Sequence, residues 1–270
     1  DNLIVEKLYI EVVCHSGKDQ AAAIIAGSHT HFVFAERNDE VVLDERQPGG
    51  ADEDDTDIQL SMRMVYDFAM TAPLDEISFI LKTKEYNMRA AELSIKGNYG
   101  HCLGKTMDRP MSHGIFGNSI FSHIISRTAS ACDARMGGAM IPVMSNSGSG
   151  NQGICATNPV AVYALENENT EEELIRALML SHLTAIYIKQ SLGKLSALCG
   201  CVVASIGSSC GITYLMGGDY QRICNSVKNM VANLTGMICD GAKPSCSLKI
   251  SSGVSTALLS RSEEHTSELQ

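Results

Sequence analysis

The stretch TEEELIRALMLSHLTAIYIKQSL, from Thr170 to Leu192, is the most regular part of the chain and decides its fold class. Its apolar residues recur three and four positions apart, a spacing that places them on one face of an α-helix. Thr170 and Glu173 form a capping-box pattern, acidic residues fill the first turn, and Gly193 follows the last turn. We therefore predict a long helix over residues 170–192.

The same spacing predicts helices through most of the preceding sequence. It occurs in IQLSMRMVYDFAM (58–70) and, after Pro73, in LDEISFILKTKEYNMRAAELSI (74–95). Nearer the N-terminus, VEKLYIEVVC (5–14) and THFVFAERNDEVVL (30–43) are rich in β-branched and aromatic residues with partial period-two alternation, which is typical of strands. The predicted fold class is α+β, with a small N-terminal β-containing segment followed by a mainly α-helical domain.

These patterns predict four regions. Residues 1–50 form a partial β-rich domain, and the acidic part of QPGGADEDDTD, residues 51–57, is a linker or solvated loop. Residues 58–260 form the helical domain. The tail RSEEHTSELQ (261–270) resembles the translation of a sequencing adapter, so we exclude it from the fold. Because the chain begins at Asp1 rather than Met, we expect an N-terminal part to be missing.

Composition favours a globular protein in a reducing compartment. The chain has 270 residues, 44% of them hydrophobic, and no apolar run approaches the roughly 18 residues of a membrane span. Ten cysteines are too dilute for a disulfide-stapled domain, and no leader is visible, so we expect reduced thiols and a cytoplasmic location. The net charge of -10 disfavours nucleic acid as a partner, because phosphate binding needs a basic surface.

The segment SNSGSGNQGI (145–154) is the first candidate for a binding site. Gly148, Gly150 and Gly153 match the G-x-G-x-x-G pattern of dinucleotide sites, but the preceding run AMIPVM is short and broken by Pro142. Alternatively, its hydroxyl and amide side chains present hydrogen-bond donors to a small polar ligand, or the segment is a plain structural loop.

Six cysteines between Cys199 and Cys246 are the second candidate. Thiolates ligate zinc and iron-sulfur clusters, and the turn in ICDGAKPSC could bring Cys239 and Cys246 onto one metal. The chain has no C-x-x-C pair, which makes a structural zinc site less favoured. Free cysteine also packs as a small apolar residue, the interpretation we prefer for Cys14, Cys132, Cys155 and Cys224.

Other polar residues allow more than one interpretation. We interpret His29 and His31 as a surface pair on an edge strand, and His182 as a hydrogen-bonded core histidine. Asp133 and Arg135 in CDARMGG form either a structural ion pair or an arm that binds a carboxylate.

Three stretches together carry a family resemblance: RTASACDARMGGAMIPVMSNSGSGNQGICATNPVAV, ALMLSHLTAIYIKQSLGKLSALCG and GMICDGAKPSCSLKI. They resemble the L-cysteine desulfidase family, which is related to the alpha portion of iron-sulfur L-serine dehydratases, and the resemblance covers about Tyr9 to Leu258. It implies an oxygen-labile [4Fe-4S] cluster and no pyridoxal phosphate. The family's cluster ligands fall on Cys199, Cys239 and Cys246, which leaves Cys201 and Cys210 as packing residues near the cluster.

The resemblance implies an iron-sulfur-dependent lyase that converts L-cysteine to pyruvate, ammonia and sulfide. Three thiolates leave one iron open as a Lewis acid. The implied substrate-binding residues are Ser145, Asn146, Ser147, Gly148, Ser149 and Asn151, with Asp133 and Arg135 as supports. The alternatives are an L-serine dehydratase and a non-catalytic metal- or nucleotide-binding domain. The expected partner is a small amino-acid substrate, with no nucleic acid and no membrane, and a homodimer is the assembly we consider.

The chain departs from the family pattern at its ends. The family's proton-accepting cysteine lies in a C-T-E-P type loop, and that motif does not occur in the 270 residues. The family's C-terminal helical continuation is also missing after about Leu258. We therefore expect this chain to be a fragment that contains the cluster ligands but does not turn over substrate.

Overall fold

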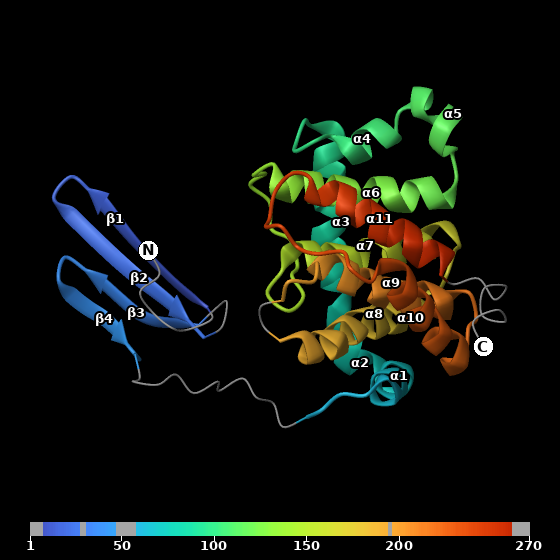
Figure 1. Cartoon of the computed structure of the whole chain (residues 1–270), viewed down its shortest axis with the longest axis horizontal. Coiled ribbons are helices and arrows are strands. Elements are labelled where there is room, and N and C mark those ends of the chain that lie inside the picture. The colour runs from blue at the N-terminus through green and yellow to red at the C-terminus, as the bar shows by residue number, and fades with distance from the viewer. Residues whose placement is uncertain (1–7, 28–30, 47–57, 194–195, 261–270) are drawn as a thin grey trace. The chain divides into compact units, whose positions relative to one another are not determined.

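The computed structural model of the chain describes residues 8–27, 31–46, 58–193 and 196–260 (Figure 1). The chain divides into two compact units, residues 1–59 and residues 60–270. The first contains an antiparallel sheet and the second is helical, so the predicted α+β class is confirmed. The expected linker at 51–57 and the tail at 261–270 lie outside the described residues.

The first unit is a four-stranded antiparallel sheet in the order β1-β2-β3-β4. The strands are β1 (Tyr9–Ser16), β2 (Asp19–Ala26), β3 (Phe32–Arg37) and β4 (Glu40–Asp44). Asn38 and Asp39 join β3 to β4 with φ of 50° and 66°, the left-handed conformation that tight hairpins require. Both predicted strand segments are confirmed where they are described.

The sheet has a small core of its own, built from Ile24, Ala26, Val33 and Phe34. The Arg46 guanidinium lies 3.9 Å from the centroid of the Phe34 ring and covers it. Cys14 lies on the edge strand β1 and is exposed. The prediction that Cys14 packs as a core residue is therefore wrong, because none of the described elements of this unit covers that part of β1.

The second unit contains the predicted helices. Their bounds are α1 (Met62–Thr71), α2 (Leu74–Ile77), α3 (Leu81–Lys96), α4 (Leu103–Met107), α5 (His113–Phe116), α6 (Ile120–Met136), α7 (Gly150–Glu166), α8 (Glu171–Leu192), α9 (Gly200–Leu215), α10 (Tyr220–Leu234) and α11 (Cys246–Leu259), with 3-10 turns at Ser78–Ile80 and Pro110–Ser112. The predicted helix over 74–95 is interrupted, because the turn at Ser78–Ile80 separates α2 from α3.

Helix α8 begins and ends where the sequence predicts. The Thr170 hydroxyl accepts a hydrogen bond from the Glu173 N–H at 3.3 Å, and the Glu173 carboxylate accepts one from the Thr170 N–H at 2.8 Å. The hydrogen bonds that the Glu173 carboxylate accepts from the Thr170 N–H and hydroxyl lower the pKa of Glu173. Gly193 ends the helix with φ of 76°, a conformation that glycine adopts without a steric penalty.

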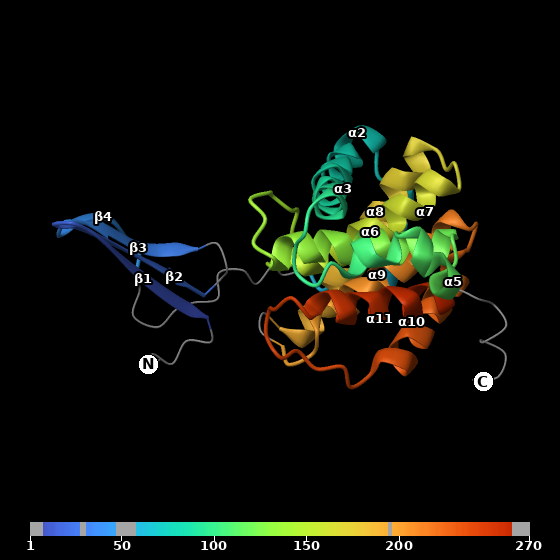
Figure 2. The ribbon, with the colours of Figure 1, turned by 90° about the horizontal axis from the view of Figure 1, so that it is seen from above.

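Helix α9 is the centre of the helical unit. It contacts α7, α8, α10 and α11, and the two ribbon views show it enclosed by them (Figures 1 and 2). Nearly all of its residues are buried, as expected for a helix that is apolar all round. Because these neighbours hold α9 in place, they also fix its first turn, and Cys199 is the N-cap residue there.

Small residues let α9 approach its neighbours closely. A Cβ atom on Gly207 would lie 2.2 Å from the Ser181 carbonyl oxygen of α8, and one on Gly211 would lie 2.8 Å from the Ala177 carbonyl oxygen. On the other side, a Cβ on Gly253 of α11 would lie 2.6 Å from the Ser205 hydroxyl oxygen. The packing of α8, α9 and α11 therefore depends on these glycines.

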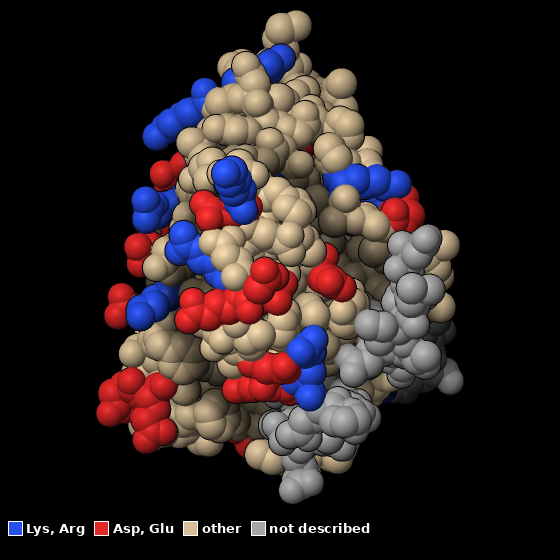
Figure 3. Space-filling view, turned by 90° about the vertical axis from the view of Figure 1, so that its left-hand side faces the viewer, with Lys and Arg blue, Asp and Glu red and all other residues tan. Residues whose placement is uncertain are grey.

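The face of the protein drawn in Figure 3 carries charges of both signs. On the face drawn in Figure 3, Lys and Arg side chains are interspersed with Asp and Glu side chains. Within the described residues, no helix combines the length and the apolar character that crossing a bilayer requires.

Replacing Gly207 should test the close contact between α8 and α9. We expect Gly207→Ala to lower the free energy of unfolding by about 2 kcal/mol, because overpacking against a backbone carbonyl forces the two helices apart. Urea unfolding followed by circular dichroism measures this change. The matched control is Gly114→Ala in α5, where a Cβ would meet nothing within 4 Å. Equal unfolding midpoints for the two variants would contradict the proposed packing constraint.

Candidate functional site

The tip of the Ser- and Gly-rich loop is a tight two-residue turn. Asn146 and Ser149 exchange backbone hydrogen bonds of 3.1 and 3.0 Å, and Ser147 and Gly148 between them have φ of 46° and 78°. Two consecutive positive φ values are typical of a type I′ turn. Ser147 has a Cβ, so its left-handed conformation costs of order 1 kcal/mol and needs support from its surroundings.

The support comes from the Asn146 side chain. Its Nδ2 donates to the Nδ1 atom and to the carbonyl oxygen of His182, both at 3.1 Å. Its Oδ1 accepts from the Ser147 hydroxyl at 2.9 Å and from Gln152 Nε2 at 3.1 Å. Both amide hydrogens and both oxygen lone pairs are therefore used. Asn146 thus shapes the loop, and it has no spare hydrogen-bonding capacity for a ligand.

His182 extends this network into the helical core. It lies on α8, is almost fully buried, and its Nε2 is 2.9 Å from the Thr157 hydroxyl oxygen. Thr157 accepts a hydrogen bond from Asn87 Nδ2 at 3.2 Å, and Asn87 Oδ1 accepts from the N–H of Met144 at 2.8 Å. Because Met144 directly precedes the loop, this network connects the helical core to the loop. The prediction that His182 is a hydrogen-bonded core residue is confirmed.

Helix α7 begins directly after the turn. Ser149 is its N-cap residue and accepts a hydrogen bond from the Gln152 N–H at 3.3 Å. Gly153 allows the close approach, because a Cβ there would lie 2.0 Å from the Met144 carbonyl oxygen. Asn151 is buried, and its Oδ1 has no hydrogen-bond partner among the residues that the structure describes. A buried acceptor without a partner is costly unless something else supplies a donor.

Arg135 lies against the start of α7. A Cβ on Gly150 would be 2.3 Å from Arg135 Nε, so only glycine leaves room for this side chain. Among the described residues, no carboxylate forms an ion pair with Arg135. A guanidinium beside a helix N-terminus attracts anions, since both carry positive charge. This arrangement suits the carboxylate-binding interpretation of Arg135.

Asp133 occupies a different environment from Arg135. Its carboxylate is buried and accepts hydrogen bonds from the backbone N–H groups of His101 and Gly104, both at 3.2 Å, and from Ser247. Burial raises its pKa, and the hydrogen bond from Gly104 opposes that shift. Asp133 therefore ties α6 to α4 and α11, and in the described structure it forms no ion pair with Arg135. Its role as a support for substrate stays a prediction.

The dinucleotide interpretation of the loop is wrong. A Rossmann loop follows a buried parallel strand, whereas residues 139–145 form no strand and the described sheet is antiparallel and lies in the other unit. Two of the three glycines in the pattern, Gly150 and Gly153, lie inside α7. Their role is to permit close packing against Arg135 and Met144.

The cysteine segments meet at the start of α9. The Cys199 N–H donates to the Met237 carbonyl at 3.2 Å, and the Cys239 N–H donates to the Ala197 carbonyl at 2.7 Å. These bonds flank an antiparallel bridge between Leu198 and Ile238. Cys199 and Cys239 therefore lie on adjacent, paired segments.

Cys246 is connected to the same loop. Its Sγ accepts a hydrogen bond from the Lys243 N–H at 3.5 Å and donates to the Gly241 carbonyl at 3.8 Å. These contacts fold the chain after Cys239 back onto the first residue of α11. All three cysteines predicted as ligands thus belong to one end of the helical unit.

Lysine side chains fix this loop and add positive charge to it. Asp240 pairs with both Lys243 and Lys249, and these bonds lower the pKa of Asp240 to about 2. Lys249 also donates to the Ile238 carbonyl at 3.2 Å and interacts electrostatically with Cys199 and Cys239. The Cys199 thiol is nevertheless favoured in its neutral form, because its interaction with Cys201 and burial raise its pKa.

Several cysteines that the sequence assigns to packing also gather here. Cys201 forms side-chain hydrogen bonds with Cys155 and Cys199, and the bond with Cys155 together with burial raises its pKa. Cys132 is fully buried close to Cys201 and Cys246, and burial raises its pKa.

The packing interpretation holds for most of these cysteines. Cys132, Cys155, Cys201 and Cys210 are buried and Cys224 is half-buried. Burial raises the pKa of Cys210 to about 12.

The three predicted ligands suit an iron-sulfur cluster in chemistry but are not gathered at ligand distance. All are free thiols, and soft thiolates are the usual ligands of such clusters. Cys199 and Cys246 are buried, however, whereas Cys239 is exposed. Over residues 8–27, 31–46, 58–193 and 196–260, no group of three or more His, Cys, Asp or Glu side chains is close enough to hold a metal ion. The ligand set stays a prediction.

Gln152 connects the loop to the cysteine segment. Its Nε2 donates to Asn146, and its Oε1 lies 2.9 Å from the position that a Cβ on Gly200 would occupy. Gly200 is the first residue of α9 and stands between Cys199 and Cys201. The two candidate sites, which are about 50 residues apart in the sequence, are therefore neighbours in space. The spacing of residues along the chain carries no signal for this contact.

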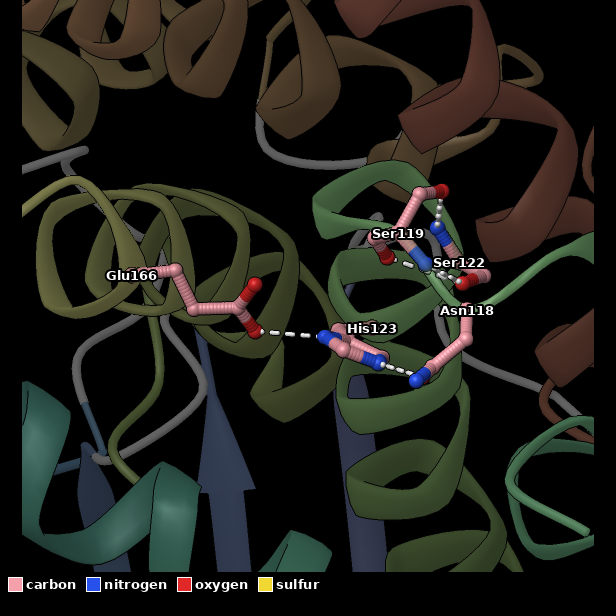
Figure 4. Close-up of polar contacts among 5 residues, drawn as sticks. All are labelled: Asn118, Ser119, Ser122, His123 and Glu166. Carbon is pink, nitrogen blue, oxygen red and sulfur yellow. Dashed lines mark hydrogen bonds and ion pairs between the residues drawn. The ribbon is translucent and has the colours of Figure 1, made fainter.

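A second polar cluster lies at the opposite end of α6 and α7. His123 bonds to Glu166 through Nδ1 at 2.8 Å and to Asn118 through Nε2 at 2.7 Å (Figure 4). Ser119 and Ser122 form a reciprocal capping box beside it. The cluster ties the first turn of α6 to the last turn of α7, and sequence reasoning missed it. His31, predicted as a surface residue on an edge strand, is exposed and lies 3.8 Å from Glu45, but it precedes β3, which is an inner strand; His29 lies outside the described residues.

The burial of His182 predicts a loss of stability in acid. Burial lowers its pKa from 6.5 to about 4, so between these values the unfolded chain binds a proton that the folded chain does not. The free energy of unfolding should therefore fall by about 3 kcal/mol as pH drops from 6.5 to 4. His182→Asn should remove this part of the pH dependence, measured by urea unfolding at several pH values. The exposed His15→Asn control should keep it.

Comparisons with known proteins place the chain in a family. Residues 15–262 match the family model described as serine dehydratase alpha chain. The chain is 66% identical over 257 residues to a UPF0597 protein of Bacteroides fragilis and 65% identical to one of Bacteroides thetaiotaomicron, with 95% of this chain covered in each case. A UPF0597 protein of Porphyromonas gingivalis is 50% identical over 262 residues.

The chain covers only part of these relatives. It spans 60% of the length of each of these three proteins. No solved structure matches it. Because the family model matches nearly the whole described chain, the relation to serine dehydratases expected from the sequence is confirmed, and this chain belongs to the serine dehydratase alpha chain family.

Proposed function

We propose that the protein to which this chain belongs is a lyase that eliminates the β-substituent of a small L-amino acid, with L-cysteine as substrate and pyruvate, ammonia and sulfide as products. Membership of the serine dehydratase alpha chain family supports the lyase class. The contact between Gln152 and Gly200 carries the proposal, because it puts a polar loop suited to an amino acid beside the cysteine segment. The resemblance to L-cysteine desulfidases supports the choice of substrate.

The start of α7 would bind the substrate's carboxylate. Arg135 supplies a guanidinium without a carboxylate partner among the described residues, and the helix N-terminus supplies N–H groups and partial positive charge. The Ser147 hydroxyl donates its hydrogen to Asn146, so its oxygen would accept a hydrogen bond from the substrate's ammonium. Asn151 Oδ1, which has no partner in the described part of the chain, would accept a hydrogen bond from the substrate's ammonium.

The cysteine segment would hold the cofactor. Cys199, Cys239 and Cys246 would ligate a [4Fe-4S] cluster, which supplies an open iron as a Lewis acid for the departing sulfur. Gln152 would fix the distance between the bound amino acid and this segment. Loss of the Cα proton and of hydrosulfide gives 2-aminoacrylate, which hydrolyses to pyruvate and ammonia. No described residue is assigned as the base.

L-Serine is the second candidate substrate. The description of the matched family favours it, because the same elimination on L-serine releases water instead of hydrogen sulfide. A loop that binds the carboxylate and ammonium does not discriminate between the two substrates, since both groups are common to them. The leaving group alone differs.

An anaerobic product assay on the full-length UPF0597 protein of Bacteroides thetaiotaomicron, 65% identical to this chain, tests the substrate. After cluster reconstitution, we expect equal amounts of pyruvate and sulfide from L-cysteine, with kcat/KM roughly tenfold above that for L-serine. The 270-residue chain should show no turnover in the same assay. A preference for L-serine would establish the dehydratase alternative, and inactivity of the full-length protein on both amino acids would refute the lyase.

Arg135 can be tested separately by ligand binding to the 270-residue chain under reducing conditions. Arg135→Gln should weaken L-serine and L-cysteine binding about tenfold, because it removes a charge-assisted contact to the carboxylate. Isothermal titration calorimetry measures the affinity. The matched control is Arg89→Gln, which replaces an exposed cation of α3 that pairs with Glu85 at 3.9 Å. An equal effect of both substitutions would count against a specific role for Arg135.

A further inference from the structure

The orientation of the Asn146 amide is set by His182. The His182 carbonyl and Nδ1 both face Asn146 Nδ2, while the Ser147 hydroxyl and Gln152 Nε2 both face Asn146 Oδ1. Turning the amide over would place its NH2 group against the Gln152 NH2 group and its oxygen against the His182 carbonyl. Such a flip would lose the bonds to the His182 carbonyl and to Gln152 in a buried site, and with the ring proton on Nε2 it would also lose the bond to Nδ1.

This arrangement also fixes the tautomer of His182. Nδ1 accepts from Asn146 and so carries no proton, which puts the ring proton on Nε2. Nε2–H then donates to the Thr157 hydroxyl oxygen at 2.9 Å. Thr157 belongs to α7 and is itself held by Asn87. The His182 carbonyl thus orients the Asn146 amide, this orientation selects the Nε2–H tautomer, and that tautomer supplies Nδ1 as a second acceptor for the same amide.

The orientation of the Asn146 amide affects both parts of the candidate site, the loop tip and the cysteine segment. Asn146 Oδ1 holds the Ser147 hydroxyl in a left-handed turn, and it also holds the Gln152 side chain whose Oε1 lies against Gly200. His182 touches neither Ser147 nor the cysteine segment in any of its hydrogen bonds. It acts on both through one amide group.

We propose that His182 is a positioning residue whose Nε2–H tautomer orients the Asn146 amide, and thereby sets the loop tip and the separation of the loop from Cys199. The structural part stands on the hydrogen bonds alone, whereas its effect on ligand affinity rests on the proposed function. Ligand-free measurements test the first part and binding tests the second.

Two substitutions separate positioning from simple core packing. In His182→Asn, the side-chain oxygen takes the place of the Nδ1 acceptor facing Asn146, whereas in His182→Gln the amide takes the place of the Nε2 donor facing Thr157. Both replace the ring by a smaller amide, so both leave a cavity. Only the first retains the acceptor that orients Asn146.

Hydrogen exchange of the Ser149 amide reads the turn without any ligand, because this N–H donates to the Asn146 carbonyl. We expect exchange in His182→Asn within about threefold of the unsubstituted chain and exchange in His182→Gln roughly tenfold faster. Nitrogen NMR of the imidazole should show the proton on Nε2. Equal acceleration in both variants, or a proton on Nδ1, would overturn the proposal.

If His182→Gln does not fold, Thr157 provides the second pair. Thr157→Ser keeps the hydroxyl acceptor and should keep the Nε2–H tautomer, whereas Thr157→Val removes the acceptor and should accelerate Ser149 exchange several-fold. The same exchange rates in both variants would contradict the proposal.

Affinity for L-serine and L-cysteine should follow the exchange rates, with about a tenfold loss in the His182→Gln variant. If the unsubstituted chain and the full-length Bacteroides thetaiotaomicron relative both fail to bind either amino acid while the exchange pattern holds, the proposed function fails and the positioning role of His182 stands.

Discussion

The close contact between α8 and α9 is the constraint on which the helical unit depends. At Gly207 the two helices approach so closely that a single added carbon would lie 2.2 Å from the Ser181 carbonyl oxygen. His182, the next residue on α8, is thereby held in the core, while the start of α9 is held beside α7. Because packed helices are nearly incompressible, one contact fixes both the polar network and the cysteine segment.

Within this frame the loop at Ser145–Ser149 is shaped by buried hydrogen bonds. Asn146 uses its whole hydrogen-bonding capacity on the protein, and the left-handed Ser147 depends on it. Beside the loop, and among the described residues, the Arg135 guanidinium has no carboxylate partner and Asn151 Oδ1 has no hydrogen-bond partner. The residues that shape the loop have used their hydrogen-bonding capacity, whereas the residues beside the loop have not. Such a site is suited to binding a small charged molecule.

Much of this was predictable from local pattern. Helical spacing identified α1, α3 and α8, and the capping box located the start of α8, because these signals lie within a few residues of one another. The break at Ser78–Ile80 was missed, since its local spacing continues that of a helix. Cys14 was assigned to packing from its residue type, and its exposure follows from its place on an edge strand.

The fold class, the family and the residues of the loop could be predicted from the sequence, because residue type, spacing and family pattern are properties of the chain. The separate roles of these residues became visible in the folded structure. In that structure Asp133 binds backbone N–H groups and holds helices together, Arg135 lies at the start of α7, and Gln152 lies against Gly200. Such contacts join segments tens of residues apart, and their existence depends on how closely helices pack, which no local pattern records.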